Sequence, residues 1–348
     1  MGELRQILEL WKDAGAAGED VCLATIAAIE GSAYRRPGAR MLLTSSGQRA
    51  GTISGGCLEA EVAKKAWWLT DKGPALQRYS SFFDDDGDIP YGLGCGGTVI
   101  VLLERGEPAA EALQALRRSH DQRLPSVIVF SLDARLPGAL LILNHAAEAV
   151  FGDDRNQDAL AAARGALRAR ESRQTDRYFI EFVAPPPALF VFGAGDDAQP
   201  LVELAGMLGW HATVADGRSQ LARPERFPRA AIVTGLDQAL SPAPGPDDAA
   251  VIMTHSYEQD RKLLRMLLPQ DLKYLGILGP RLRTERLAAE IAPEIGLTTA
   301  ACMARLHTPV GLDLGGHFPA AIALSIAAEL QAVFAGRLGI SSAQPVHA

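Results

Sequence analysis

The chain has 348 residues, of which 48% are hydrophobic and 22% are charged. These proportions exclude a largely disordered chain, and the length is enough for two domains that each bury a core. A formal net charge of -7 without a basic run argues against nucleic acid as the main partner, because phosphate binding needs clustered Lys and Arg.

Neither a membrane nor a disulfide framework is expected. No apolar stretch reaches the roughly 18 residues that a spanning helix needs. The first residues, MGELRQILELWKD, have the pattern of an amphipathic charged helix rather than a signal peptide, so we expect a cytoplasmic location. The chain has four cysteines, Cys22, Cys57, Cys95 and Cys302. They are too few to form a disulfide framework in a chain of this length, which favours reduced thiols.

The first part of the chain mixes helical and strand patterns and predicts a mixed α/β domain. Apolar residues recur at helical spacing near the start, and later runs alternate between good helix formers and short apolar strands. The pattern predicts helices over 4–11, 58–67, 107–119 and 157–169, and strands over 21–26, 40–44, 48–53, 98–104, 126–130, 139–143 and 177–183.

Cys57 follows the flexible turn Ser54-Gly55-Gly56 and stands at or near the start of the predicted helix 58–67. That position lowers the pKa of a thiol and favours the thiolate, the form that attacks electrophiles or binds soft metals. The alternative is a buried cysteine beside a tight turn. The pattern leaves both interpretations open.

Cys95 lies in Gly94-Cys95-Gly96-Gly97, where glycine on both sides leaves its sulfur open to a ligand. A tight turn with an incidental cysteine is the alternative. If the fold brings Cys57 and Cys95 together, the two thiolates could share a metal or a dithiolene-type ligand. Neither belongs to a C-x-x-C pair, so a structural zinc site is not expected, and the sequence leaves the identity of any metal open.

Three prolines at 185–187 mark the domain boundary, which divides the chain into 1–184 and 185–348. An apolar run follows, and then a Gly-x-Gly-x-x-Ala turn over 193–198 that leads into a helix. Strands and helices then alternate, which predicts a Rossmann-like parallel sheet with helices on both faces. The predicted strands are 189–192, 212–215, 231–234, 250–253 and 274–278.

Ligands of such a sheet bind outside the carboxyl ends of its strands, where the strand order reverses. This rule selects Gly193 and Gly195 of the turn, then Asp216, His255 and Arg281. Asp216 stands where an acid would accept hydrogen bonds from a ribose, and Arg281 stands at a helix start that suits an anion. His255 is either an acid or base over the cleft or a simple hydrogen-bonding residue.

Asp196 and Asp197 weaken the prediction of an NAD(P) site. Carboxylates near the start of a helix are favourable toward the helix dipole, yet they repel the pyrophosphate that this kind of turn normally holds. Dinucleotide binding is therefore a doubtful expectation. A later loop that contains His307 and Asp313 among glycines could close over the cleft or only hold its own shape.

Eight motifs, in this order, resemble the XdhC/CoxI family, the xanthine dehydrogenase accessory factors. The resemblance runs from about Gly31 to about Glu329, and preserved order makes it more specific than any single motif. The motifs are GSAYRRPGARM, GTISGGCLE, GLGCGG, PPPALFVFGAGDDAQPL, TVADGR, THSYEQD, LGILGPRLR and HTPVGLDLGG.

The resemblance implies a cytoplasmic maturation factor that binds molybdenum cofactor, supports its sulfuration with a cysteine desulfurase, and delivers it to a molybdenum hydroxylase such as xanthine dehydrogenase. It implies an N-terminal XdhC/CoxI domain, a C-terminal Rossmann-like domain, and a homodimer. The two cysteine motifs of the family fall on Cys57 and Cys95.

Two other functions remain as alternatives to that of a chaperone, which would carry the cofactor without catalytic turnover. An NAD(P)-dependent oxidoreductase would need a nucleotide site and an acid or base such as His255. A non-catalytic docking scaffold would bind its partner enzymes without using the cysteines or the turn at Gly193.

Overall fold

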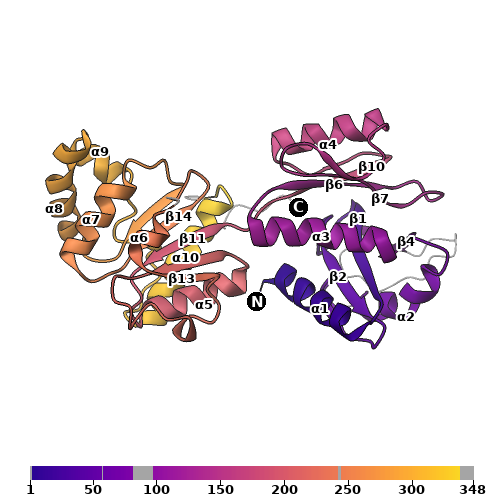
Figure 1. Cartoon of the computed structure of the whole chain (residues 1–348), viewed down its shortest axis with the longest axis horizontal. Coiled ribbons are helices and arrows are strands. Elements are labelled where there is room, and N and C mark those ends of the chain that lie inside the picture. The colour runs from indigo at the N-terminus through magenta and orange to yellow at the C-terminus, as the bar shows by residue number, and fades with distance from the viewer. Residues whose placement is uncertain (1, 57, 81–96, 242–243, 338–348) are drawn as a thin grey trace. The chain divides into compact units, whose positions relative to one another are not determined.

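A computed structural model describes residues 2–56, 58–80, 97–241 and 244–337. The chain forms two compact units, one over Glu3–Pro186 and one that begins at Pro187, and the elements of each are labelled in Figure 1. In the part of the chain that the structure describes, no helix has the length and apolar character needed to cross a membrane.

The first unit is a mixed α/β unit. Its helices are α1 (Glu3–Ala17), α2 (Glu59–Leu69), α3 (Gly106–Gln122) and α4 (Gln157–Ala169). Its strands are β1 (Val21–Gly31), β2 (Arg40–Thr44), β3 (Arg49–Gly51), β4 (Ala75–Ser80), β5 (Gly97–Arg105), β6 (Ser126–Ser131), β7 (Gly138–Leu143), β8 (Ala149–Gly152), β9 (Arg173–Gln174) and β10 (Tyr178–Val183).

Within this unit the described strands form two antiparallel sheets. One has the order β3-β2-β1-β5-β4 and the other β8-β7-β6-β10-β9. A shared core fills the space between them, where Leu23 and Leu102 of the first sheet pack with Phe130 and Phe179 of the second and with Leu113 of α3. Helix α2 covers the outer face of the first sheet, and α4 covers that of the second.

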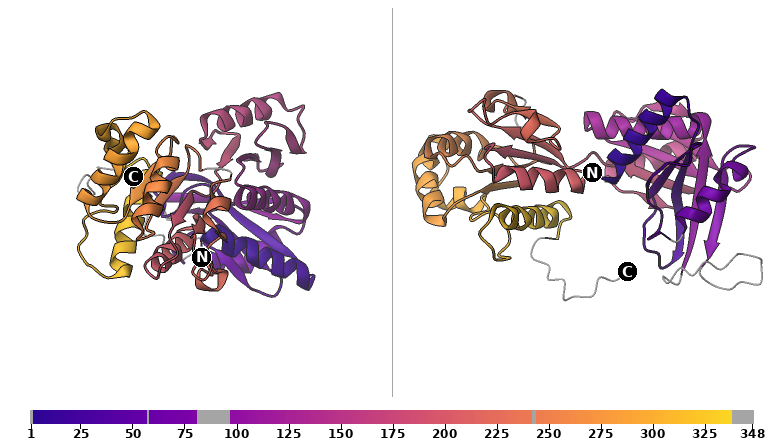
Figure 2. Two further views of the ribbon diagram at one scale, coloured as in Figure 1. Left: turned by 60° about the vertical axis from the view of Figure 1, so that its left-hand side comes forward. Right: turned by 90° about the horizontal axis from the view of Figure 1, so that it is seen from below.

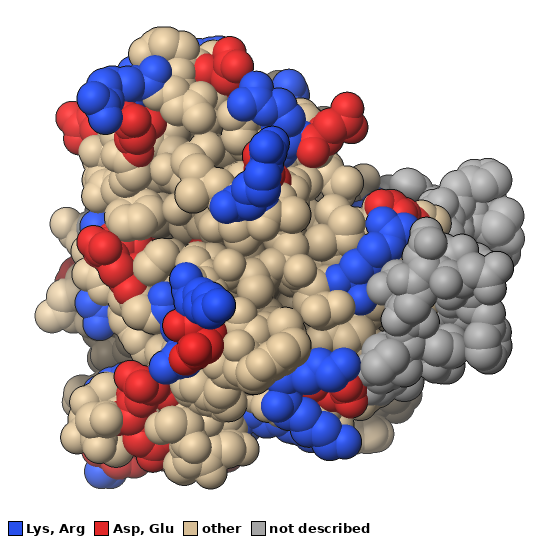
Figure 3. All heavy atoms as spheres, turned by 90° about the vertical axis from the view of Figure 1, so that its right-hand side faces the viewer, with Lys and Arg blue, Asp and Glu red and all other residues tan. Residues whose placement is uncertain are grey.

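Charged groups of both signs lie on the face of this unit that Figure 3 shows. On the face shown in Figure 3, Lys and Arg side chains lie beside Asp and Glu side chains, and neither sign gathers into a patch. This face therefore does not provide the one-sided positive field that attracts a phosphate backbone.

The second unit contains the predicted parallel sheet. Its strands are β11 (Ala188–Phe192), β12 (His211–Ala215), β13 (Ile232–Thr234), β14 (Ala249–Ile252) and β15 (Tyr274–Ile277), paired in the order β13-β12-β11-β14-β15. Its helices are α5 (Ala198–Leu208), α6 (Leu236–Ala239), α7 (Tyr257–Leu267), α8 (Arg281–Ile291), α9 (Thr299–Ala304) and α10 (Pro319–Phe334), with short 3-10 turns at Pro224–Arg226 and Ala292–Ile295.

Helices cover both faces of the parallel sheet, which confirms the predicted fold class. On one face Leu201 of α5 and Ile326 of α10 pack against Val191 and Val251 of the sheet. On the other face α7 and α8 pack through Leu264 and other apolar side chains. The yellow helix α10 can be followed beside the sheet in Figure 2. Because both faces are buried, these strands are continuous apolar runs rather than alternating ones.

Charged side chains are buried between the two sheets of the first unit. Arg40 of β2 and Glu181 of β10 form an ion pair, with Arg40 Nη1 donating to Glu181 Oε1 at 2.8 Å. Glu104 of β5 is fully buried, and its Oε1 accepts a hydrogen bond from the Ala139 N–H at 2.7 Å. Burial raises the pKa of Glu104 to about 7, although the Ala139 N–H and the charge of Arg40 act in the opposite direction.

We expect Glu104 to make the stability of the first unit depend on pH. Its pKa is raised in the folded state, so its stabilising contribution is complete below the ordinary value of 4.5 and is lost as pH rises through about 7. The free energy of unfolding should therefore fall by about 3 kcal/mol across this window relative to a Glu104→Gln variant.

Urea unfolding at pH 5 and pH 7.5 measures this difference, with tryptophan fluorescence as the signal because Trp11, Trp67 and Trp68 of the four tryptophans lie in this unit. Parallel pH profiles for the wild-type chain and the Gln variant would contradict the assignment.

Candidate functional site

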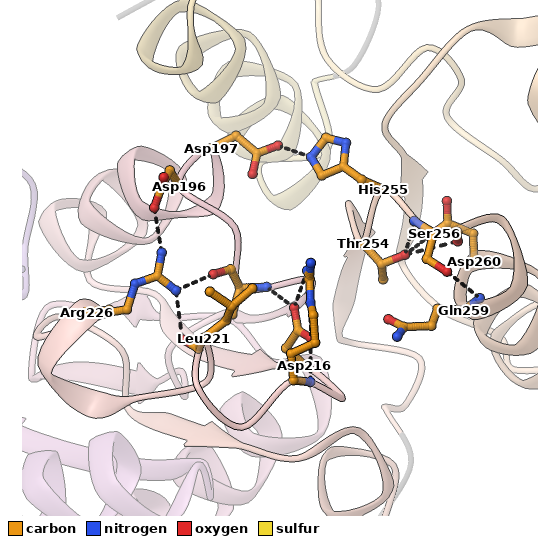
Figure 4. Close-up of polar contacts among 12 residues, drawn as sticks. Asp196, Asp197, Asp216, Leu221, Arg226, Thr254, His255, Ser256, Gln259 and Asp260 are labelled. Carbon is orange, nitrogen blue, oxygen red and sulfur yellow. Dashed lines mark hydrogen bonds and ion pairs between the residues drawn. The ribbon is translucent and has the colours of Figure 1, made fainter.

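Four of the five residues selected in the second unit lie at the carboxyl ends of neighbouring strands. Gly193 and Gly195 follow β11, Asp216 follows β12 and His255 follows β14. The strand order runs outward from β11 in both directions, so the crevice between the ends of β11 and β14 is the switch point of the sheet. Figure 4 shows Asp216 and His255 in this region.

Gly193 lets the ends of β11 and β14 approach closely. Its φ is +120°, and a Cβ built on it would lie 2.3 Å from the carbonyl oxygen of Met253. Its N–H donates to the Ala215 carbonyl at 2.8 Å, which ties the turn to β12 as well. Only glycine combines this backbone conformation with this contact. Gly193 therefore shapes the crevice.

The carboxylate of Asp197 folds back over Gly195. A Cβ built on Gly195 would lie 2.6 Å from Asp197 Oδ1, so the carboxylate occupies the space in front of the second glycine. In a dinucleotide-binding turn that glycine leaves room for the pyrophosphate. An acid at the start of α5 is also favourable toward the helix dipole. The protein thus supplies its own anion where a ligand phosphate would approach.

His255 holds this carboxylate from the other side of the crevice. Its Nε2 lies 2.7 Å from Asp197 Oδ2, and Figure 4 shows the two side chains pointing toward one another. His255 has a φ of +60°, a conformation that few residues other than glycine adopt. Its side chain is 61% exposed, whereas that of Asp197 is 17% exposed. The imidazole therefore reaches the solvent side of the crevice while it holds Asp197.

Asp216 is engaged within the protein. Its carboxylate accepts hydrogen bonds from the Ala194 N–H and the Arg218 N–H, both at 2.8 Å, and from the Arg218 guanidinium at 2.9 and 3.1 Å. Burial alone would raise the pKa of Asp216, but these donors outweigh it and the pKa lies below its ordinary value. Asp216 thus fixes the glycine turn to the loop after β12.

Arg226 holds the outer side of the same turn. Its guanidinium donates to the Ala194 carbonyl at 2.7 Å and to Asp196 Oδ1 at 2.6 Å. Asp196, Asp197 and Asp216 each have a basic partner, which is Arg226, His255 and Arg218 respectively. The sequence analysis did not select Arg218 or Arg226 as site residues. The Asp-Gly-Arg run over 216–218 was a sequence signal for Arg218.

Arg281 pairs within its own helix. Its Nε donates to Glu285 one turn along α8 at 3.0 Å, and its side chain is 62% exposed. Arg283 reaches the crevice indirectly, because it pairs at 2.7 Å with the buried Asp260, which accepts a hydrogen bond from Thr254 beside His255. The structure therefore links Arg283 to the loop of His255 through this chain of contacts.

The loop over 306–316 is held by a carboxylate of α10. Glu329 accepts hydrogen bonds from the Tyr274 hydroxyl at 2.5 Å and from the Gly311 N–H at 2.7 Å, and lies 2.8 Å from His307 Nδ1. Burial would raise the pKa of Glu329, but the contacts with His307 and Tyr274 outweigh it and lower the pKa. His307 therefore holds the shape of this loop, whereas Asp313 is exposed.

Cys57 and Cys95 lie outside the described residues. Hydrogen bonds join the segment before Cys57 to α2, because Glu59 Oε1 accepts from the Ser54 N–H at 2.8 Å and from the Ile53 N–H at 3.1 Å. The Ser54 hydroxyl in turn accepts from the Leu58 N–H at 3.1 Å. These contacts hold the turn against the start of α2.

The two remaining cysteines are buried thiols. Burial raises the pKa of Cys22 to about 12 and also raises that of Cys302, which keeps both in the unreactive thiol form. Among the residues that the structure describes, no three His, Cys, Asp or Glu side chains gather to form a metal site.

The fold and site define a two-unit protein whose Rossmann-type domain carries a carboxylate in its glycine turn. The pattern of the XdhC Rossmann domain matches residues 189–330, and that of the XdhC and CoxI family matches residues 14–80. A Bacillus subtilis protein, named as a probable component of xanthine dehydrogenase, is 32% identical over 321 residues, which cover 90% of this chain and 92% of that protein. The chain belongs to the XdhC and CoxI family, as its motifs indicated.

Two further proteins are similar over most of their length. The "Molybdenum cofactor insertion chaperone PaoD" of Escherichia coli is 24% identical over 329 residues, covering 94% of this chain and 88% of that protein. A crystal structure from Bacillus halodurans, described as a xanthine dehydrogenase, has a TM-score of 0.76 at 28% identity and covers 98% of both chains.

We expect Asp197→Ala to open the glycine turn to a pyrophosphate group. The wild-type chain should bind NAD weakly, and loss of the carboxylate should raise the affinity for NAD by about tenfold or more, because one repulsive charge and its volume are removed together. Isothermal titration calorimetry measures this change.

A second variant separates the effect of the Asp197 charge from that of its volume, and a third is a control. Asp197→Asn removes the charge but keeps the side-chain volume, so it should give a smaller gain. Asp313→Ala removes an exposed acid of the same unit and should change nothing. Tight NAD binding by the wild-type chain, without a gain in Asp197→Ala, would show that the carboxylate does not block the turn.

Proposed function

We propose that the protein is a maturation factor that binds molybdenum cofactor as its cargo. In this proposal it supports sulfuration of the cofactor together with a cysteine desulfurase and delivers the cofactor to a molybdenum hydroxylase of the xanthine dehydrogenase type. It acts in the cytoplasm as a homodimer and handles the cofactor rather than turning over a substrate of its own.

The observation that carries this proposal is the near full-length similarity to two named relatives. One is named as a probable component of xanthine dehydrogenase and the other as an insertion chaperone for molybdenum cofactor. The alignment to the chaperone covers 94% of this chain, so it includes both units rather than the Rossmann-type domain alone. A role that uses both units is therefore favoured.

The crevice supports cargo handling over NAD(P) chemistry. A nicotinamide enzyme needs its pyrophosphate at the glycine turn, and here Asp197 Oδ1 lies in front of Gly195. Pterins present hydrogen-bond donors and acceptors along a ring edge, which an exposed imidazole such as that of His255 can meet. We assign contact with the cargo to His255 and Arg281, and the shape of the crevice to Gly193, Gly195 and Asp216.

We assign the sulfur chemistry to Cys57 and Cys95. The segment 53–59 supports this assignment, since Ser54 and Glu59 brace the turn from which α2 begins. A thiol just before a helix start gains from the partial positive charge there and shifts toward the thiolate. Thiolates suit a soft centre such as molybdenum held by a dithiolene.

Native mass spectrometry of the chain, purified from cells competent for molybdenum cofactor synthesis, tests this function. The wild-type chain should retain the cofactor, and a Cys57→Ala, Cys95→Ala double variant should retain about tenfold less or lower, as expected when metal-supporting groups are lost. The matched control is Cys22→Ala, Cys302→Ala, which removes the two buried thiols and should leave retention unchanged.

Three other outcomes would contradict this proposal or favour another function. Unchanged retention in the first double variant would remove the thiols from the mechanism. Substrate-dependent hydride transfer with NAD(P) would identify an oxidoreductase instead. Binding of the hydroxylase by every variant, without cofactor on any of them, would identify a docking scaffold.

A further inference from the structure

A small pocket lies in the first unit, beside the end of α3. Its walls come from α3, from the segment that leads into β6, and from the end of β7 with the turn and strand that follow. Helix α3 packs against β6 and β7 (Figure 1). The pocket has a volume of about 210 Å³, which is roughly that of seven waters in the liquid. It therefore has room for a small organic molecule rather than for a large cofactor.

Apolar side chains form much of the lining. Leu124, Ile142 and Val150 line the pocket, and none of the lining residues, all of which the structure describes, is an Asp or Glu. Glu148 belongs to the turn after β7, but its carboxylate accepts a hydrogen bond from Asn144 Nδ2 at 2.9 Å. The pocket thus combines apolar walls with a lack of acidic side chains.

Arg118 of α3 supplies a positive charge to this lining. Its side chain is half-buried, and it forms no hydrogen bond or ion pair with any residue that the structure describes. The partial negative charge at the end of α3 attracts the guanidinium but takes up none of its N–H donors. A guanidinium with its donors free matches a planar carboxylate, which accepts two parallel hydrogen bonds from it.

Ser126 supplies a second donor. It is 7% exposed, it lines the pocket, and its Oγ is buried without a hydrogen-bond partner among the described residues. Side chains alternate along β6, so Ser126 lies on the same face as Ile128 and Phe130, which share a core with Leu113 of α3. A buried hydroxyl without a partner is costly, and its hydrogen can turn toward an acceptor that a ligand brings.

We propose that this pocket binds a small carboxylate with a short, branched apolar body. The carboxylate accepts hydrogen bonds from Arg118 and Ser126, and the apolar body lies against Leu124, Ile142 and Val150. The same carboxylate chemistry belongs to a free organic acid and to the last residue of a polypeptide. The inference goes beyond the cofactor proposed above and does not rest on it.

Titration of the methyl-labelled full-length chain with isovalerate tests the site by NMR. Ile142 lines the pocket, so its δ1 methyl resonance is the reporter, assigned by its loss in Ile142→Val. This resonance should shift saturably with isovalerate. Isovaleramide has the same shape without the charge, and it should bind more weakly by about tenfold or more, because it lacks the charge-assisted contact.

Variants of the two donors should weaken isovalerate binding by different amounts. Arg118→Ala should weaken it by about tenfold or more, and Arg118→Lys by less, because lysine keeps the charge but not the paired donors. Ser126→Ala should weaken it by about fivefold, the effect of one hydrogen bond. That variant should not lower the midpoint of urea unfolding, because the hydroxyl has no described partner to lose.

The matched control is Arg117→Ala. Arg117 is the neighbouring arginine of α3, but its guanidinium donates to Gln114 at 2.8 Å and lies over the ring of Trp11. Its removal should leave isovalerate binding unchanged. The proposal would be overturned by the lack of a saturable shift, by equal binding of isovaleramide, or by unchanged binding in Arg118→Ala. Tighter binding of inorganic phosphate than of isovalerate would also overturn it.

N-acetylvaline distinguishes the two sources of the carboxylate. It presents the same branched body and carboxylate, together with the amide that precedes a chain end. Tighter binding of N-acetylvaline than of isovalerate would support a polypeptide terminus, and the reverse would support a free acid. Arg118→Ala should retain molybdenum cofactor as the wild-type chain does, so the failure of either proposal can be recognised separately.

Discussion

The contact between Asp197 and His255 shapes the crevice of the parallel-sheet unit. It places a carboxylate over Gly195, in the space that a pyrophosphate normally takes, and joins the loop after β11 to the loop after β14. The backbone of His255 has a φ of +60°, a conformation that the loop after β14 must hold in place. We propose that a fold that commonly binds dinucleotides is thereby turned toward other ligands.

The surrounding ion pairs make this arrangement stable. Asp216 and Arg218 fix the turn from the β12 side, and Arg226 fixes it from the outside through Asp196 and the Ala194 carbonyl. The three carboxylates at the switch point thus each have a basic partner.

The sequence predicted the architecture better than the site. Apolar runs separated by helix formers predicted the parallel sheet, because burial on both faces leaves a strong local signal. Short strands such as β8 and β9 carried too few residues for such a signal. The His255–Asp197 contact joins residues 58 positions apart, and Arg40–Glu181 joins residues 141 positions apart. Which charges meet over such distances depends on topology, so the sequence showed the acids at 196 and 197 but not their partners.

The most direct test of this account is the amide resonance of Gly195 in glycine-labelled protein titrated with inorganic pyrophosphate. If Asp197 fills the turn, the Gly193 and Gly195 resonances of the wild-type chain should stay in place at pyrophosphate concentrations that shift them in Asp197→Ala. A saturable shift of the Gly195 resonance in the wild-type chain would contradict the account, because the turn would then be open to phosphate.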